Sequence, residues 1–124
     1  GEITHLERLK TGALIGFCCD AGAILGRAQD KEHRALAGFS HDLGLAYQIA
    51  DDLLDVVGNV ETVGKAVGKD AARGKATFIS ILGVEKARAQ ALLLADQAAN
   101  HLDCFGGRGR HLRELARYVV ERSL

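Results

Sequence analysis

The sequence predicts an all-α protein, built as an antiparallel bundle of helices. Its 124 residues contain no proline, and 48% of them are hydrophobic. Alanine and leucine recur at spacings of three and four residues, the pattern of helices that bury one face. The fifteen glycines are many for such a fold, so several of them must permit close helix packing or mark breaks. A chain of this length forms one domain or part of one.

The first helix is expected over residues 4–27. Thr4 and Glu7 have the spacing of a capping box, in which each side chain binds the free backbone N–H of the other residue. The apolar stripe of this helix comprises Leu6, Leu9, Ala13, Leu14, Phe17, Ala21, Ile24 and Leu25. Lys10 projects from the stripe, so its ammonium needs an anion or a route to water. Thr11, beside it, adds a hydroxyl that can donate to a phosphate oxygen.

The second helix is expected over residues 30–58 and carries an acidic turn, Asp51, Asp52 and Asp55, in an otherwise apolar run. On a helix the polar side chains fall within an arc of about 140°. The members of this arc are Tyr47, Gln48, Asp51, Asp52 and Asp55. A helix that is apolar over most of its surface is packed on most sides, so we expect the arc to face an internal cavity.

Three carboxylates on one arc repel one another unless a cation neutralises them. Asp51 and Asp55 are one turn apart, which places their Cβ atoms about 6 Å from each other. Mg²⁺ prefers oxygen ligands, and where a protein offers few carboxylates it shares its shell with substrate phosphates. The pattern therefore predicts a magnesium ion that carries a phosphorylated ligand. The alternative is an acidic patch in contact with solvent, which the short Asp-Asp-x-x-Asp spacing alone leaves open.

A glycine-punctuated loop is expected over residues 59–75, directly after the acids. Its charged residues are Glu61, Lys65, Lys69, Asp70, Arg73 and Lys75. Beside a metal held by the acids, the lysines suit the oxygens of a diphosphate. The alternative is an ordinary solvated loop, whose lysines only keep it soluble. A helical stretch from residue 77, kinked near Gly83, is then expected to reach residue 102, followed by a flexible turn at 105–109 and a last helix over 110–122.

Composition narrows the class of function. The 16 basic and 16 acidic residues balance, which argues against a nucleic-acid partner. The sequence contains neither an apolar run near the roughly 20 residues of a membrane span nor a secretory signal, so we expect a cytoplasmic protein. Its three cysteines, Cys18, Cys19 and Cys104, lack a zinc-ligand spacing and are expected to be buried thiols.

These motifs together resemble the trans-isoprenyl diphosphate synthases, the polyprenyl synthetase family, and most closely its bacterial farnesyl diphosphate (geranyl-transferring) type. Residues 44–55 look like the family's second aspartate-rich motif. Residues 10–14, which begin Lys10-Thr11, are similar to its Lys-Thr motif, and residues 64–77 to the segment that follows the acids. Three motifs in the same order are more specific than any one of them.

The resemblance implies a magnesium-dependent, head-to-tail condensation. An allylic diphosphate, dimethylallyl or geranyl, would react with isopentenyl diphosphate to give farnesyl diphosphate. It implies that Asp51 is a direct metal ligand, and that Asp52 and Asp55 bind metal directly or through water. The residues implied in catalysis or substrate binding are Lys10, Thr11, Gln48, Lys65 and Lys75. Lys10 and Lys65 would bind the allylic diphosphate.

The resemblance covers only the C-terminal part of the isoprenoid synthase fold, over residues 1–124, without the first aspartate-rich motif of the family. We therefore expect no activity from this chain alone. Apolar faces that lack their usual neighbours also predict a homo-oligomer, such as a dimer. Two alternatives stay open: a terpene cyclase, which the Lys-Thr and Gly-Lys segments disfavour, and a noncatalytic helical subunit or fold-only relic.

Overall fold

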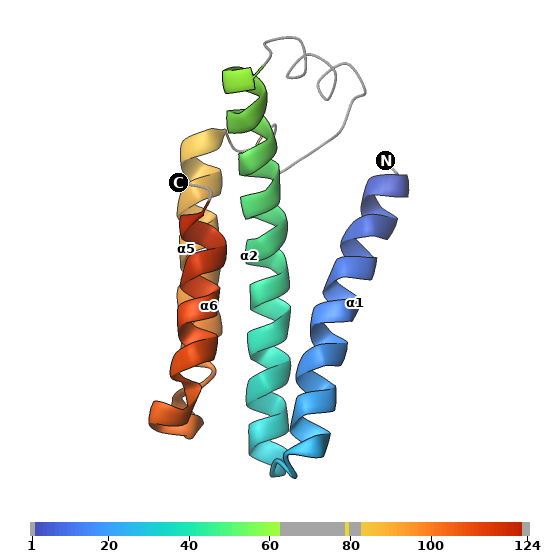
Figure 1. The fold of residues 1–124 in the computed structure, drawn as a ribbon, viewed down its shortest axis with the longest axis vertical. Coiled ribbons are helices and arrows are strands. Elements are labelled where there is room, and N and C mark those ends of the chain that lie inside the picture. Colours follow the sequence, from blue (N-terminus) through green and yellow to red (C-terminus); the bar gives the residue numbers. More distant parts are fainter. Residues whose placement is uncertain (1, 63–78, 80–82, 123–124) are drawn as a thin grey trace.

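The structure, a computed structural model, describes residues 2–62, 79 and 83–122 and confirms the all-helical fold. Its elements are α1 (Glu2–Leu25), α2 (Asp30–Thr62), α5 (Val84–Asn100), the short 3-10 helix η1 (Asp103–Gly109) and α6 (Arg110–Glu121). Successive α-helices run antiparallel, with α2 between α1 on one side and α5 and α6 on the other (Figure 1). None of these described helices is both long and apolar enough to cross a membrane.

Several predicted boundaries need correction. α1 begins at Glu2, so Thr4 lies inside the helix and the predicted capping box is wrong. α2 continues to Thr62, so the first residues of the predicted loop are helical, whereas residues 63–75 lie outside the described part of the chain. The break near Gly83 is confirmed, since Gly83 has a φ of 84° and precedes α5. The predicted flexible turn is instead part of η1, which bends at Gly106.

The core lies where α2 packs against α5 and α6. Its largest fully buried side chains are Phe39, Ile49, Leu53, Leu102 and Val120. α5 presents a row of buried alanines to this core, Ala87, Ala91, Ala95 and Ala98. Because alanine side chains are short, they let the backbones of α5 and α2 approach closely. This packing determines which side of α2 is left for polar residues.

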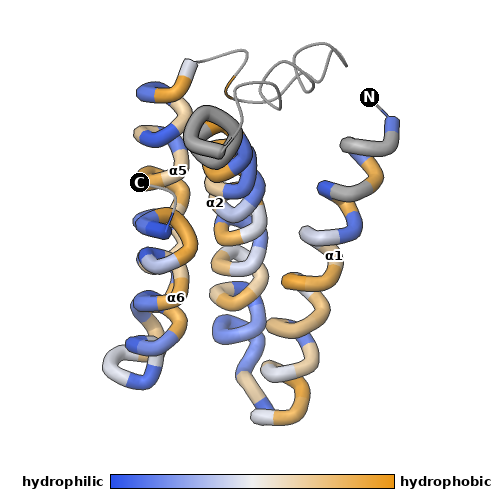
Figure 2. Tube along the Cα trace, turned by 45° about the horizontal axis from the view of Figure 1, so that its top comes forward, coloured by the Kyte–Doolittle hydropathy of each residue, from blue (hydrophilic) through white to orange (hydrophobic). Residues whose placement is uncertain are grey.

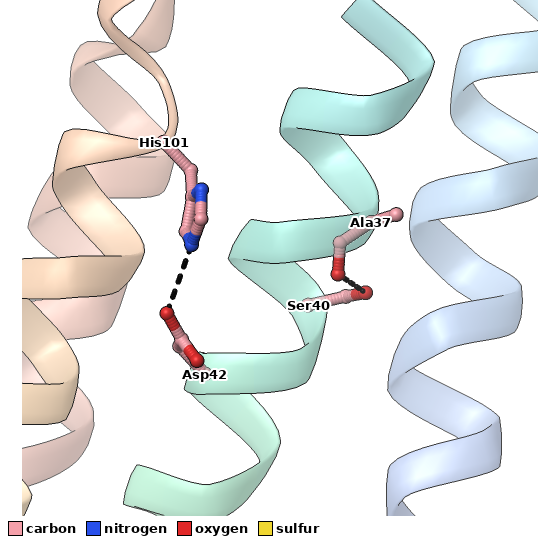
Figure 3. A network of polar contacts seen from close by, with 4 residues as sticks. All are labelled: Ala37, Ser40, Asp42 and His101. Carbon is pink, nitrogen blue, oxygen red and sulfur yellow. Dashed lines mark hydrogen bonds and ion pairs between the residues drawn. The ribbon is translucent and has the colours of Figure 1, made fainter.

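A polar contact joins α2 to the end of α5. Nε2 of His101, the C-cap residue of α5, lies 2.9 Å from Oδ2 of Asp42 (Figure 3). The imidazole ring sits directly over Gly38, where a Cβ would come within 2.6 Å of ring atoms. Nearby, Ser40 Oγ donates to the carbonyl oxygen of Ala37 at 3.0 Å (Figure 3). A Cβ at position 38 would therefore have to displace the imidazole ring of His101.

α1 makes its extensive contacts with α2, and the two helices diverge from their connecting turn toward the N-terminus of α1 (Figures 1 and 2). Most of the predicted apolar stripe of α1 is not buried against α2. Its large side chains, Leu6, Leu9, Leu14, Phe17, Ile24 and Leu25, are between 57% and 84% exposed. The face of α1 that contacts the core carries Ile15, Cys19 and Ala23 instead. The expectation of a packed stripe is therefore wrong within this chain.

The close approach of His101 can be tested with an added methyl group. Gly38→Ala is expected to lower the free energy of unfolding by about 1–3 kcal/mol, because the methyl overlaps the imidazole. Gly16→Ala is the matched control, since no atom lies within 4 Å of its new Cβ. That variant is expected to gain roughly 0.5–1 kcal/mol from helix propensity. Urea unfolding followed by circular dichroism measures both changes.

The double variant Gly38→Ala with His101→Ala removes the overlapping ring. It is expected to tolerate the methyl at position 38 better than the chain that keeps His101. Equal effects of Gly38→Ala and Gly16→Ala would contradict the packing of the ring on α2.

Candidate functional site

The acidic turn is oriented by the core on the other side of α2. Leu53 is fully buried in that core. Asp51 and Asp55 each lie two residues from Leu53, which places them about 160° around the helix from it. Both side chains are exposed, whereas Asp52, about 100° from Leu53, is partly buried. Burial of Leu53 therefore turns Asp51 and Asp55 away from the core.

An ion pair that the sequence pattern does not predict connects Asp52 to α1. Arg8 Nη2 donates to Asp52 Oδ2 across 2.9 Å. The two side chains are 26% and 16% exposed, so the pair is largely shielded from solvent. Arg8 shares its face of α1 with Gly12, Ile15 and Cys19, at helical spacing. A face that combines Gly12 with the half-buried apolar residues Ile15 and Cys19 is the signal that identifies Arg8 as a neighbour of α2.

Lys10 lies on a different side of α1. It is two residues from Arg8 and therefore about 160° around the helix from it. Its side chain is exposed, as are those of Leu6 and Leu14 on the same stripe. Thr11 is half-buried. Among the described residues no ion pair joins Lys10 to a carboxylate, so the pocket that Lys10 and Asp51 are expected to share stays a prediction.

Gln48 lies in the wall of a cavity of about 530 Å³ between α1 and α2. The wall also contains Arg8, which forms the ion pair with Asp52. Gly12 and Gly44 meet where the two helices are close, since a Cβ on Gly44 would lie 3.8 Å from Gly12 Cα. The other residues of the wall are His5, Leu9, Ala13, Ser40, His41 and Leu45. The structure thus brings Gln48 together with the Arg8 guanidinium, but places neither Lys10 nor Thr11 in this wall.

The donor chemistry of the acidic turn fits magnesium. Within residues 2–62, 79 and 83–122, no three His, Cys, Asp or Glu side chains form a group that could hold a metal ion by themselves. Mg²⁺ commonly takes one or two carboxylates and completes its shell with water and phosphate oxygens. The exposed carboxylate of Asp51, one turn from Asp55, is a donor of this kind. Lys65 and Lys75 lie outside the described residues, so their place near the acids stays a prediction.

A second cavity of about 610 Å³ has almost entirely apolar walls, formed by α1, α2, η1 and α6. Phe39 and Leu43 line it, together with Cys18 and Cys19. Burial raises the pKa of the Cys19 thiol, and the neighbouring Cys18 and Asp20 add to the effect. Cys19 therefore carries little thiolate at neutral pH and acts as a small apolar side chain. Cys18 and Cys104 are exposed and Cys19 is half-buried, so the expectation of three buried thiols is wrong.

Comparison with known proteins gives consistent matches over most of the sequence. The family model described as "Polyprenyl synthetase" matches residues 3–104. A dimethylallyltranstransferase of Fischerella ambigua (strain UTEX 1903) is 40% identical over 121 residues, which are 98% of this chain and 35% of that protein. A farnesyl diphosphate synthase of Escherichia coli (strain K12) is 39% identical over 127 residues, which are 98% of this chain and 42% of that protein.

A solved structure gives the same result for the fold. The crystal structure of an FPP/GFPP synthase from Zymomonas mobilis matches with a TM-score of 0.73 and 49% sequence identity. The match covers 95% of this chain and 36% of that one. The arrangement of α1, α2, α5 and α6 is therefore a portion of the isoprenoid synthase fold, as the sequence predicts. The chain spans between 35% and 42% of the length of these three relatives.

Proposed function

Because the chain belongs to the polyprenyl synthetase family of trans-prenyltransferases, we propose that it forms part of a magnesium-dependent prenyltransferase. The reaction would join an allylic diphosphate to isopentenyl diphosphate, head to tail. The observation that supports this most is the acidic turn of α2. Its Asp51 projects away from the core, and Asp52 lies beside the cavity that contains Gln48 and Arg8.

The acids would bind the metal and, through it, the diphosphate. We propose Asp51 as a direct ligand of Mg²⁺, and Asp52 and Asp55 as ligands directly or through water. When bound, Mg²⁺ would neutralise the negative charge of the departing diphosphate. The exposure of Asp51 supports this role, since an ion that arrives with a phosphorylated substrate can reach its oxygens.

The remaining proposed residues would bind and orient the substrates. Lys10, Lys65 and Lys75 would bind phosphate oxygens, because an ammonium is a strong donor to a charged oxygen. Thr11 and Gln48 would lie near the reacting carbons. The place of Gln48 in a cavity wall that also contains apolar side chains supports its part. Such surroundings keep water away from a carbocation-like centre.

Farnesyl diphosphate is the product we propose, from dimethylallyl or geranyl diphosphate. The relative from E. coli is named a farnesyl diphosphate synthase, and the one from Z. mobilis an FPP/GFPP synthase. These names support a farnesyl product for the enzyme of which this chain forms a part.

A noncatalytic helical subunit is the second candidate. The observation that favours it is the exposed position of Lys10, on the side of α1 away from Arg8. Such a subunit has no need to bind a metal diphosphate, so ligand binding distinguishes the two functions.

The chain is expected to bind pyrophosphate in the presence of Mg²⁺ and not after the metal is removed with EDTA. Isothermal titration calorimetry measures this binding. Asp51→Asn is expected to weaken the binding of magnesium pyrophosphate by about tenfold or more. Loss of a residue that only supports a metal ligand commonly lowers metal affinity by that much, and Asp51 is proposed as a ligand itself. Asp103→Asn, at the start of η1, is a matched control and should leave the affinity unchanged. Binding that is absent, or equal without Mg²⁺, would support the noncatalytic subunit.

The exposed stripe of α1 is expected to make the chain self-associate, with a dimer as the proposed state. Leu6 and Phe17 are 63% and 67% exposed, and large apolar patches usually mark sites of association. The double substitution Leu6→Ser and Phe17→Ser should shift the sedimentation coefficient to that of a monomer at unchanged helix content. A chain that is already monomeric at high concentration would contradict the expectation.

A further inference from the structure

We propose that the apolar cavity of about 610 Å³ between α1, α2, η1 and α6 binds the hydrocarbon chain of a prenyl substrate or product. The hydrocarbon would start at the metal-bound diphosphate and run along α1 and α2, so that its terminal isoprene unit lies in the cavity. The inference rests on the proposed function, because it names the part of the ligand that extends from the acidic turn. It gives a role to Cys18, Leu43 and Leu115, which the motifs of the sequence do not include.

The wall of the apolar cavity has the chemistry that a hydrocarbon requires. Among the described residues of the wall, Arg108 carries the only charge. Its guanidinium lies 3.5 Å from a carboxylate oxygen of Glu32 and 5.7 Å from the centroid of the Phe105 ring, so this charge has neighbours within the chain. The rest of the wall consists of aliphatic and aromatic side chains, glycines and the thiols of Cys18 and Cys19. Such a wall favours the burial of apolar surface over the binding of a diphosphate.

Two rows of side chains connect the proposed diphosphate site with the apolar cavity. On α2, Leu43 is two steps of four residues before Asp51, the spacing of a helical ridge. On α1, Leu14 and Cys18 continue the same spacing from Lys10. Because α1 and α2 run antiparallel, the N-terminus of α1 and the C-terminus of α2 lie at the same end of the bundle (Figure 1). Both rows therefore lead from that end toward the cavity.

The distances along α2 match the length of a farnesyl chain. At a rise of about 1.5 Å per residue, Leu43 lies about 12 Å and Phe39 about 18 Å from Asp51 along the helix axis. A fully extended farnesyl chain spans about 14 Å and a dimethylallyl group about 4 Å, for carbon–carbon bonds of roughly 1.5 Å. A farnesyl chain that starts at the acids therefore reaches the cavity, whereas a dimethylallyl group ends before Leu43.

The apolar cavity is accessible from solvent. Leu14 and Leu115 line it and are 64% and 43% exposed. Phe39, which also lines it, is fully buried and belongs to the core. A ligand can therefore enter past the two leucines without displacing the core.

A docking surface for a second copy of the chain is the competing explanation. The exposed stripe of α1, which includes Leu14, borders the cavity and is expected to promote self-association. A second copy would cover the cavity increasingly as the protein concentration rises, whereas a hydrocarbon would occupy it as the hydrocarbon concentration rises. The double substitution Leu6→Ser and Phe17→Ser separates the two, because it is expected to keep the chain monomeric and neither residue lines the cavity.

Alkylation of Cys18 by N-ethylmaleimide tests the proposal on the original chain and on this double variant, because the exposed thiol lines the cavity. Farnesol has the hydrocarbon chain without the diphosphate. At about ten times its dissociation constant it should slow the alkylation of Cys18 by about tenfold, since only the free chain reacts. Prenol, the alcohol of the dimethylallyl group, should protect far less because it buries less apolar surface. Cys104 is exposed and does not line the cavity, so its alkylation rate, measured on the same digested chain by mass spectrometry, should stay unchanged.

A larger side chain at the mouth of the cavity tests the direction of the hydrocarbon. Leu115→Trp should weaken the binding of farnesyl diphosphate with Mg²⁺ by about tenfold or more, because room for a single methylene group already changes discrimination by that much. It should leave the binding of dimethylallyl diphosphate with Mg²⁺ unchanged, since that group ends before the cavity. Leu93→Trp is the matched control, because Leu93 is an exposed leucine of α5 outside the wall. Isothermal titration calorimetry measures the affinities.

Circular dichroism shows whether each variant is folded. Cys18→Phe obstructs the cavity from α1 instead of α6, at a side chain that is exposed. It should weaken the binding of farnesyl diphosphate in the same way, so the test does not depend on the folding of Leu115→Trp.

Three results would overturn the proposal. Equal protection of Cys18 and Cys104 by farnesol, or none, would show that the cavity does not bind the hydrocarbon. Protection of Cys18 that rises with protein concentration alone would show that a second copy covers the cavity. Equal affinities of Leu115→Trp and Leu93→Trp for farnesyl diphosphate would show that the hydrocarbon leaves the acidic turn in another direction.

Binding of pyrophosphate with Mg²⁺ distinguishes these failures from a failure of the proposed function. If the original chain binds magnesium pyrophosphate, each of the three results leaves the proposed function intact. If it does not, the proposed function fails and the prenyl ligand fails with it, even where farnesol protects Cys18.

Discussion

The packing of α2 against α5 is the constraint on which the rest of the structure depends. The alanines of α5 let α2 approach closely, and Leu53 and Ile49 are fully buried as a result. Since a helix cannot rotate without exposing these side chains, Asp51 is held on the outer side of α2. The position of the acidic turn is therefore a consequence of apolar burial on the far side of the same helix.

Helical periodicity was enough to predict which polar residues share one side of α2. The common arc of Gln48 and the three aspartates follows from their spacing. Gln48 lies in a cavity wall, but Asp51 and Asp55 are exposed, so the expectation that the whole arc faces an internal cavity is wrong for these two residues. Periodicity also predicted the all-helical fold of the described residues, and the glycine within the helical pattern predicted the break at Gly83. These features depend on the geometry of a single helix, which the spacing of residues in the sequence determines.

Features that depend on which faces of two helices meet were beyond the same reasoning. The most apolar stripe of α1, with Leu14 and Phe17, was expected to pack, yet the side with Gly12 and Ile15 lies against α2. Hydrophobicity measures how much a face would gain from burial, whereas the presence of small residues decides how closely two backbones can come. The ion pair of Arg8 with Asp52 was not predicted for this reason, because it depends on which face of α1 meets α2. The contact of His101 with Gly38 has the same origin.

The attachment of α1 has a consequence for the order in which the chain loses structure. α1 rests on α2 through the contact of Gly12 with Gly44, the ion pair of Arg8 and a few apolar side chains. Its backbone amides can therefore exchange with solvent through a local opening that leaves α2 and α5 together. Such an opening removes one wall of the cavity that contains Gln48. A ligand that binds in this cavity would consequently slow amide exchange along α1 more than anywhere in α5.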